Sequence, residues 1–172
     1  MPRSIIGATS ATASVCLTIS MVLAAASSRA ESLCFNGDAP PTRYAIKDGE
    51  VHDTKTDLIW QRCSVGQRWA GELGCVGVIR QMSWREALKQ ADARWQLPTK
   101  DELASLVTVE CGTPAIDERA FPDMELTKLW YWTATADGPL AWYVAFGGGS
   151  VRSGGPLELN SVRLVRHATP RR

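Results

Sequence analysis

The segment WQLPTKDEL, residues 95–103, marks where a helix begins in the middle of the chain. Pro98 disfavours the helical conformation at Leu97, so the chain should reach this point extended. Thr99 and Glu102 have the spacing of a capping box, which predicts that the helix begins just after Thr99. Its buried face is predicted to consist of Leu103, Leu106 and Val107.

A second helix is predicted upstream by the same kind of signal. Ser83 and Glu86 form another capping box, with Ser83 as the N-cap and Glu86 reaching back to it. Apolar residues then recur at helical spacing and predict one buried face. They are Trp84, Ala87, Leu88 and Ala91.

Segments with β-strand character precede the two helices. Residues 43–47 and 50–53 flank Asp48-Gly49, a pair typical of a type I′ hairpin turn. The other elements predicted before the helices are a turn at 54–57, an apolar strand at 58–60 and a loop with its own disulfide at 62–82.

The last third of the chain consists of short β-prone runs separated by glycine-rich turns. The order of strands, two helices and then further strands is typical of an α+β domain, with helices packed against an antiparallel sheet. The predicted strands are 130–133, 141–146, 150–152 and 161–166.

The first 30 residues have the order of regions found in a secretory signal peptide. Arg3 precedes a charge-free apolar run, and the small residues Ser28 and Ala30 suit a cleavage site. An uncleaved membrane anchor is the alternative, because the run is about long enough to span a bilayer. We expect cleavage, and hence a protein without membrane attachment in the periplasm, outside the cell or at its surface. The predicted limits are 1–30 for the signal peptide, 31–42 for an irregular leader, 43–167 for the domain and 168–172 for a tail.

Four cysteines remain in the predicted mature chain, an even number that suits an oxidising compartment. They allow three pairings, between which the sequence alone does not decide. The segment from Cys63 to Cys75 holds three glycines and would close readily, in which case Cys34 with Cys111 would tie the N-terminus to the middle of the chain. Zinc is the less favoured interpretation, because no CxxC pair is present and both histidines lie far from the cysteines.

The charge balance argues against a nucleic-acid partner. The whole chain has a formal net charge of +1, and the signal peptide holds two arginines and no acidic residue, which leaves −1 for the mature chain. Binding to nucleic acid needs a concentrated basic patch. The arginines near the C-terminus are interpreted as a solvated end.

The sequence contains no recognisable motif for catalysis or for a cofactor. His52 and His167 have no nucleophile at a known spacing, and His52 beside Asp53 fits a turn better than a catalytic dyad. Asp48, Glu50 and Asp53 could hold a hard cation, but calcium needs six or more oxygens and a solvated hairpin explains them better. We therefore expect no enzymatic activity, no metal and no cofactor.

Seven tryptophans are many for a domain of this size, and they suggest recognition through a surface. Successive residues of a strand face opposite sides of a sheet, so Tyr131 and Tyr143 should oppose their aromatic neighbours. One sheet face is therefore predicted to expose these tyrosines beside Arg152 and Arg163, where rings stack on sugars and guanidinium groups bind carboxylate or sulfate. The alternative is that loops cover this face. Core positions are predicted for Trp60, Trp84 and Trp95.

Several motifs follow one another in a characteristic order. They are VHDxxTxLxW from Val51, WxxAL from Trp84, WxLPTxxEL from Trp95, PxID from Pro114, FP from Phe121, YWT from Tyr131, AWYVxF from Ala141 and VRLVR from Val162. In this order they resemble a widespread bacterial domain of unknown function, which is also the C-terminal domain of collagen-like surface adhesins. The resemblance covers about residues 43–166. Two positions depart from the family pattern, since Gln96 replaces a usual arginine and Asp57 a usual glycine.

This resemblance implies a fold similar to those of C-type lectins and sulfatase-modifying-factor domains, with two helices on a twisted antiparallel sheet. The four cysteines of the mature chain predict two disulfides. The resemblance implies no particular chemistry, because the calcium-binding motifs of C-type lectins are missing. The cysteine pair of the oxygenase branch is missing too, since every mature cysteine precedes residue 112.

The leading hypothesis is an exported, non-enzymatic and adhesin-like binding module, whose partner is a glycan or an envelope protein. A second hypothesis is a structural or pilus-associated subunit that interacts with proteins. A third is a cryptic enzyme on a fold of the modifying-factor type.

Overall fold

The computed structural model describes residues 43–168. The predicted signal peptide, the predicted leader and residues 169–172 of the predicted tail lie outside the described residues. Within 43–168, no helix has the length and apolar character needed to cross a lipid bilayer.

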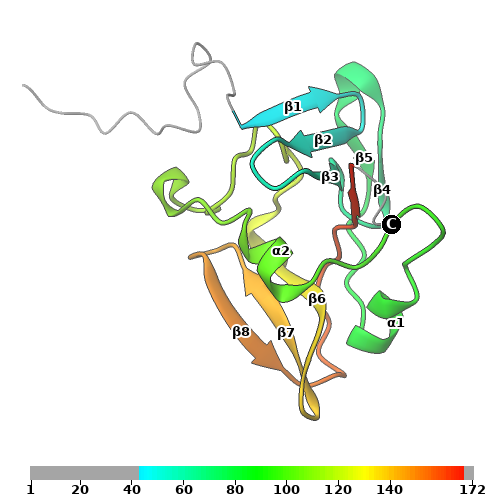
Figure 1. Ribbon diagram of the computed structural model, residues 1–172, viewed down its shortest axis with the longest axis vertical. Helices are drawn as coiled ribbons and strands as arrows, with labels where there is room; N and C mark the ends of the chain where they lie inside the picture. Colours follow the sequence, from blue (N-terminus) through cyan, green and yellow to red (C-terminus); the bar gives the residue numbers. More distant parts are fainter. Residues whose placement is uncertain (1–42, 169–172) are drawn as a thin grey trace, which may run out of the picture. The chain divides into compact units, whose positions relative to one another are not determined.

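Four short strands form the first antiparallel sheet. They are β1 (Tyr44–Lys47), β2 (Glu50–Asp53), β3 (Leu58–Gln61) and β9 (Val165–His167). Their order across the sheet is β1-β2-β3-β9 (Figure 1). The hairpin of β1 and β2 forms where the sequence predicts it, but its turn differs. Asp48 has a positive φ of 51° and Gly49 does not, whereas a type I′ turn needs a positive φ at both residues.

A two-stranded ribbon occupies much of the segment 62–82, which the sequence predicts as a loop. The ribbon consists of β4 (Gln67–Trp69) and β5 (Cys75–Gly77). The predicted Cys63–Cys75 disulfide is confirmed and links Cys63, which precedes the ribbon, to the first residue of β5. Gly66 and Gly77 look like loop residues in the sequence, yet here they let the strands approach, because a Cβ on Gly77 would lie 2.7 Å from the Gly66 carbonyl oxygen.

Both predicted helices are present, and each has only five residues. They are α1 (Trp84–Leu88) and α2 (Lys100–Ala104). Both capping boxes are confirmed. In the second, the backbone N–H of Thr99 donates to the Glu102 carboxylate at 2.8 Å, and the N–H of Glu102 donates to the Thr99 hydroxyl at 3.3 Å. The 3-10 helices are η1 (Gly71–Leu73), η2 (Val109–Cys111) and η3 (Leu126–Lys128).

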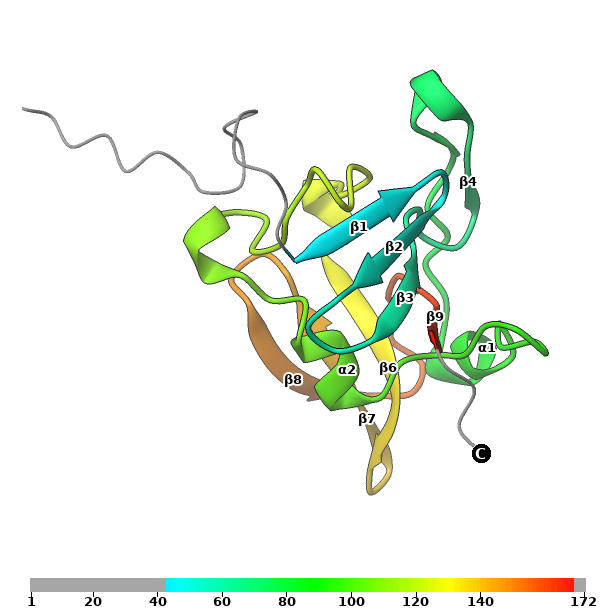
Figure 2. The same cartoon turned by 45° about the horizontal axis from the view of Figure 1, so that its top comes forward.

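Three longer strands form another antiparallel sheet. They are β6 (Trp130–Asp137), β7 (Leu140–Ala145) and β8 (Ser150–Gly154), in the order β6-β7-β8. Helix α2 contacts β6 and β7, and Figure 2 shows it in front of these strands. The strand predicted at 161–166 forms only in part. Val165 begins β9, whereas Ser161 makes a single parallel bridge to Tyr131.

The hydrophobic core lies on both faces of β6. Tyr131 belongs to a large cluster with side chains from β1, β2, β3 and α2, and Trp132 belongs to a second cluster that includes Leu97 and Val162. The structure is therefore α+β with short helices and antiparallel sheets, as predicted. Its described strands form three separate ladders rather than one twisted sheet. The likeness to C-type lectins stays a prediction.

The second predicted disulfide, Cys34 with Cys111, stays a prediction as well. Cys34 lies outside the described residues, while Cys111 ends η2. The covalent link that the structure does describe, Cys63–Cys75, joins two residues separated by 12 positions. It is therefore a local staple of the ribbon rather than a link between distant elements.

Candidate functional site

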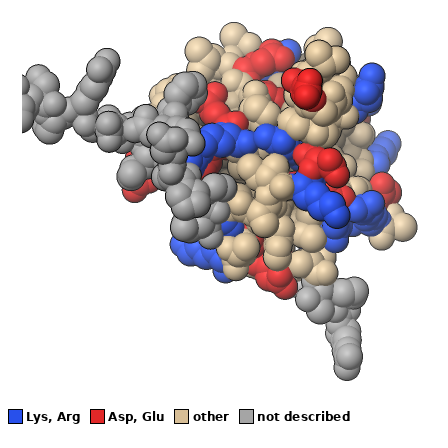
Figure 3. Space-filling view, turned by 90° about the horizontal axis from the view of Figure 1, so that it is seen from above, with Lys and Arg blue, Asp and Glu red and all other residues tan. Residues whose placement is uncertain are grey.

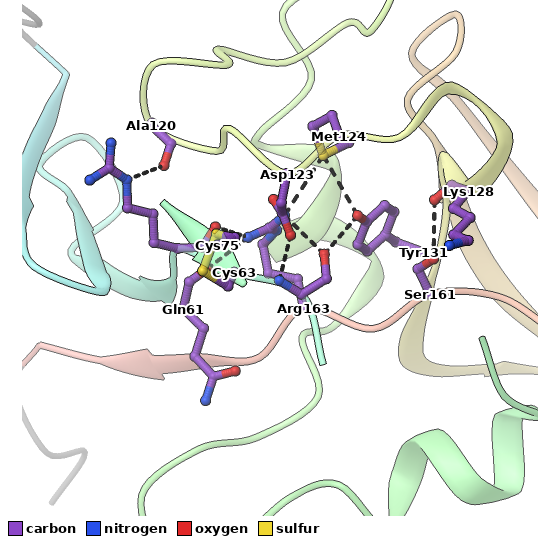
Figure 4. Close-up of polar contacts among 12 residues, drawn as sticks. Gln61, Cys63, Cys75, Ala120, Asp123, Met124, Lys128, Tyr131, Ser161 and Arg163 are labelled. Carbon is purple, nitrogen blue, oxygen red and sulfur yellow. Dashed lines mark hydrogen bonds and ion pairs between the residues drawn. A yellow bond between two sulfur atoms is a disulfide. The ribbon is translucent and has the colours of Figure 1, made fainter. Parts of the chain in front are cut away.

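A cluster of buried polar groups surrounds Arg163, one of the four residues predicted to bind a ligand (Figure 4). Its side chain is fully buried, and Nη2 lies 2.5 Å from Oδ1 of Asp123, which is also buried. Nη1 donates to the backbone carbonyls of Gln61 at 2.9 Å and Arg62 at 2.5 Å. Burial alone would raise the pKa of Asp123, but the charge of Arg163 and hydrogen bonds from Ser64 and Arg163 outweigh it and lower that pKa.

Tyr131 lies in the same buried cluster. Its hydroxyl shares a hydrogen bond of 2.8 Å with the Ser64 hydroxyl and lies 3.6 Å from the sulfur of Met124. Burial raises the pKa of this phenol. The prediction that Tyr131 and Arg163 face solvent is wrong, because both are 0% exposed. The main core covers one face of β6, and the segment leading into β9 covers Trp132 on the other.

Tyr143 and Arg152, the other two predicted residues, reach the surface. They are direct cross-strand partners on β7 and β8, and Trp130 of β6, 43% exposed, lies close to them. Together they border a hollow of about 380 Å³, the Trp130 hollow. Their role in binding stays a prediction. The hollow is lined by Leu126, Leu129, Trp130, Tyr143, Ala145, Gly147, Gly148, Ser150 and Arg152.

A larger cleft lies between the β1–β2 turn and the ribbon of β4 and β5, where the sequence predicts no site. It has a volume of about 540 Å³, and two partly buried indoles, those of Trp69 and Trp95, lie along it. Gly49 brings the turn against the ribbon, because a Cβ there would lie 2.9 Å from the Cβ of Trp69. This Trp69–Trp95 cleft is lined by Lys47, Asp48, Gly49, Glu50, Gln61, Cys63, Gln67, Arg68, Trp69, Arg94 and Trp95.

Arginine side chains hold both indoles of the cleft in place. The guanidinium carbon of Arg62 lies 3.9 Å from the ring centroid of Trp69. Those of Arg94 and Arg166 each lie 5.4 Å from the ring centroid of Trp95. All three distances are within the range of an attractive cation–π contact. The orientation of both rings is therefore restrained by neighbouring side chains.

Glu50 connects the cleft to the first sheet. One of its carboxylate oxygens pairs with Arg94, and the other accepts a hydrogen bond from Nη2 of Arg166 at 2.7 Å. The carboxylate thereby orients the two arginines that flank Trp95. Two positive charges surround one negative charge, so this wall of the cleft carries a net positive charge.

The acidic residues of the first hairpin do not meet at one point. Asp53 is buried and accepts hydrogen bonds from Nε and Nη2 of Arg43 at 3.0 and 2.7 Å, whereas Asp48 and Glu50 line the cleft. Burial would raise the pKa of Asp53, but hydrogen bonds from Arg43 and Thr56 and the charge of Arg43 lower it. Among the described residues, no three Asp, Glu, His or Cys side chains gather as a metal site would require.

Most of the described chain matches one protein-family model. The model of the Lcl C-terminal domain matches residues 49–166, from the β1–β2 turn into β9. The chain belongs to this family. The predicted resemblance to the C-terminal domain of adhesins is thereby confirmed, over a range that begins at residue 49 rather than 43. A search of curated proteins found no match.

The Trp69–Trp95 cleft of this Lcl C-terminal domain was not predicted from the sequence. Trp95 precedes Leu97 and Pro98 and therefore looks like a core residue, yet it is only partly buried. Trp69 lies in a segment predicted as a loop. One signal in the sequence does indicate that Trp69 is exposed. Its neighbours Gln67, Arg68 and Glu72 are polar, so they form no apolar stripe that would be buried together with it.

Proposed function

We propose that this protein is an exported, non-enzymatic recognition module that binds a glycan in the Trp69–Trp95 cleft. The observation that carries the proposal is the placement of two indoles and several hydrogen-bonding side chains in one cleft. The signal-like N-terminus and the Cys63–Cys75 disulfide support a location in an oxidising compartment outside the cytoplasm. Membership of the Lcl C-terminal domain family, together with the resemblance to adhesins, supports binding rather than catalysis.

The side chains of the cleft match the two kinds of surface on a sugar ring. An indole offers a flat apolar face, against which the C–H groups of a sugar pack, and Trp69 and Trp95 provide two of them. Gln61 provides a carboxamide, which both donates to and accepts from hydroxyl groups. A ligand with alternating apolar and hydroxyl surfaces therefore suits this cleft better than a purely apolar one.

The walls of the cleft are held in position without a ligand. On one side, the disulfide ties the start of β5 to Cys63, and Arg62 lies over the Trp69 ring. On the other side, Glu50 fixes the two arginines beside Trp95. A site whose side chains are already ordered loses less conformational entropy when a ligand binds.

The charge of the rim favours an acidic glycan. Lys47 and Arg68 are exposed and form no ion pair with any other residue in 43–168, and they outnumber Asp48 beside them. Arginine binds carboxylate and sulfate groups with paired hydrogen bonds. On the face shown in Figure 3, basic and acidic side chains are interspersed, so selectivity would come from the cleft itself rather than from a broad basic surface.

A glycan array probed with the purified exported protein, its disulfide intact, tests this function. We expect binding to glycans that carry uronate or sulfate, and weaker binding as salt concentration rises. Trp69→Ala should lower the affinity by roughly tenfold or more, as loss of a central aromatic contact does. Trp130→Ala, which alters an exposed tryptophan outside the cleft, is the matched control and should change nothing. Retention of no glycan, or binding that is equal in the Trp69→Ala variant, would contradict the proposal.

A further inference from the structure

Strand β8 is an edge strand of the second sheet. Its only strand partner among the described residues is β7, and Figure 1 and Figure 2 show no strand along its outer side. In an antiparallel pair, every second residue directs its N–H and C=O away from the neighbouring strand. The outer edge of Ser150–Gly154 therefore offers backbone groups to a further strand.

Apolar side chains are exposed on β8 and across the sheet from it. Val151 on β8 itself is 36% exposed, and across β7, at the β6 side of the sheet, Trp130 is 43% and Leu126 66% exposed. Natural edge strands are often protected by charges, proline or a covering segment. Here Arg152 is the charged residue of β8. The exposed apolar residues mark this part of the surface as a place for a partner.

The Trp130 hollow lies next to the same edge. Small residues, Ala145 and Ser150, form its floor on β7 and β8, and they are cross-strand partners. Tyr143 and Arg152 are the neighbouring pair on the same face. Adjacent strands are about 4.8 Å apart, so a large side chain on an added strand would reach over Ser150 into the hollow.

The charge on β8 indicates which kind of strand fits. Arg152 is exposed and forms no ion pair with any described residue, and its Nε donates to the Ser150 hydroxyl at 3.2 Å. In a symmetric pairing of two copies over the whole strand, Arg152 would lie opposite itself, because it is the central residue of the five. Like charges directly opposite each other destabilise a pair of strands. A different chain with an acidic side chain at this position fits instead.

We propose that the outer edge of β8 accepts an extended segment of a partner protein as a fourth strand of the second sheet. An acidic side chain of that segment lies beside Arg152. A large apolar side chain two residues away lies in the Trp130 hollow, because residues two apart share a face. In such complexes, backbone hydrogen bonds provide affinity, and every second side chain of the added strand provides specificity.

A library of random ten-residue peptides displayed on phage tests this interaction with the purified exported protein. We expect enriched peptides to share an acidic residue and a large apolar residue two positions apart. Arg152→Glu should weaken the selected peptides roughly tenfold or more and should select a basic residue in place of the acidic one. Arg68→Glu, a charge reversal in the Trp69–Trp95 cleft, is the matched control and should leave peptide binding unchanged.

Hydrogen exchange of the backbone amides separates strand addition from other modes of binding. The selected peptide should slow exchange at residues 150–154. The proposal would be overturned if the enriched peptides shared no pattern, or if Arg152→Glu did not alter their binding. Unchanged hydrogen exchange in β8 would overturn it as well. So would a dimer of the free protein that Arg152→Glu dissociates or tightens, because the edge would then be paired with a second copy. Glycan binding in the Trp69–Trp95 cleft should be the same in the Arg152→Glu variant, so the two proposals can fail separately.

Discussion

The interior around Arg163 and the surface around Arg152 use the same kinds of side chain under opposite conditions. In the interior, Arg163 and Tyr131 are fully buried, and Nη2 of Arg163 donates to Asp123 and Ser64, while the Tyr131 hydroxyl shares a hydrogen bond with Ser64. At the surface, Arg152 lies beside Tyr143 at the rim of an open hollow and forms no ion pair with the described part of the chain.

The difference between the two regions comes from the segments that cover them. The chain leading into β9 crosses one face of β6 and brings Arg163 inward. No described segment crosses the corresponding face of β7 and β8 near Trp130, which is 43% exposed. Arginine and tyrosine thus stabilise the fold in one region and are available for recognition in the other. Four substitutions or changes of condition test this contrast.

Removal of the Arg163 side chain should destabilise the protein most. Arg163→Ala leaves the Asp123 carboxylate buried without its partner, which typically costs about 3–5 kcal/mol of folding free energy. Arg152→Ala is the matched control and should change stability by less than about 0.5 kcal/mol, because its side chain is exposed. Urea denaturation of both variants measures the difference. Equal stability of the two variants would show that the contrast between interior and surface is wrong.

Acidification should destabilise the interior by a smaller amount. The folded protein lowers the pKa of Asp123, whereas an Asp in an unfolded chain has a pKa of about 3.9. As the pH falls, the unfolded chain therefore binds a proton first, and the stability that Asp123 contributes is lost from about pH 4 downward. Unfolding free energies measured between neutral and acidic pH should decline in this window. In an Asp123→Asn variant the decline should be shallower, with a remainder due to Asp53, Glu86 and Asp92, whose pKa values are also lowered by hydrogen bonds. A decline of equal size would rule out Asp123 as its source.

Loss of the ribbon disulfide should have an effect of similar order. Replacing Cys63 and Cys75 together by alanine removes a link across 12 positions and should cost roughly 3 kcal/mol. Because Ser64 follows Cys63 and donates its backbone N–H to Asp123, the buried cluster should loosen as well. Thermal unfolding of the double variant measures the loss, and hydrogen exchange at Ser64 should increase. Unchanged exchange there would show that the ribbon and the buried cluster are independent.

The smallest of the four effects concerns two tyrosine hydroxyls. Tyr131→Phe removes one of the two hydrogen-bond partners of the buried Ser64 hydroxyl, the other being Arg163, and should cost about 1 kcal/mol. Tyr143→Phe alters a partly exposed ring at the Trp130 hollow and should be nearly neutral. Denaturant midpoints measured side by side reveal the difference. If Tyr143→Phe lost more stability than Tyr131→Phe, the Tyr131 hydroxyl would not belong to the hydrogen-bond network that stabilises the interior.

The elements with local signals were predictable from the sequence. The capping boxes at Ser83 and Thr99 satisfy backbone N–H groups within four residues, so they act whatever the rest of the chain does. The β1–β2 hairpin depends on the local pair Asp48-Gly49 in the same way. The ends of the helices were less predictable, because burial of Leu106 continues beyond the last residue of α2.

Which face of a strand remains open could not be predicted, because it depends on contacts between distant residues. Alternation places Tyr131 and Trp132 on opposite faces correctly, but both faces of β6 are covered. Arg163 reaches Gln61 across about a hundred positions of the chain. The Trp69–Trp95 cleft likewise lies between the first hairpin, the ribbon and residues 94–95. No local sequence pattern predicts that these three segments lie side by side.

The indole N–H signals of the seven tryptophans offer the most direct test of glycan recognition in the Trp69–Trp95 cleft. In a nuclear magnetic resonance titration with an acidic oligosaccharide, the signals of Trp69 and Trp95 should shift. Those of Trp84 and Trp132, which donate to backbone carbonyls at 2.8 Å, should stay in place. Shifts confined to Trp130, or no shift at saturating glycan, would contradict recognition in this cleft.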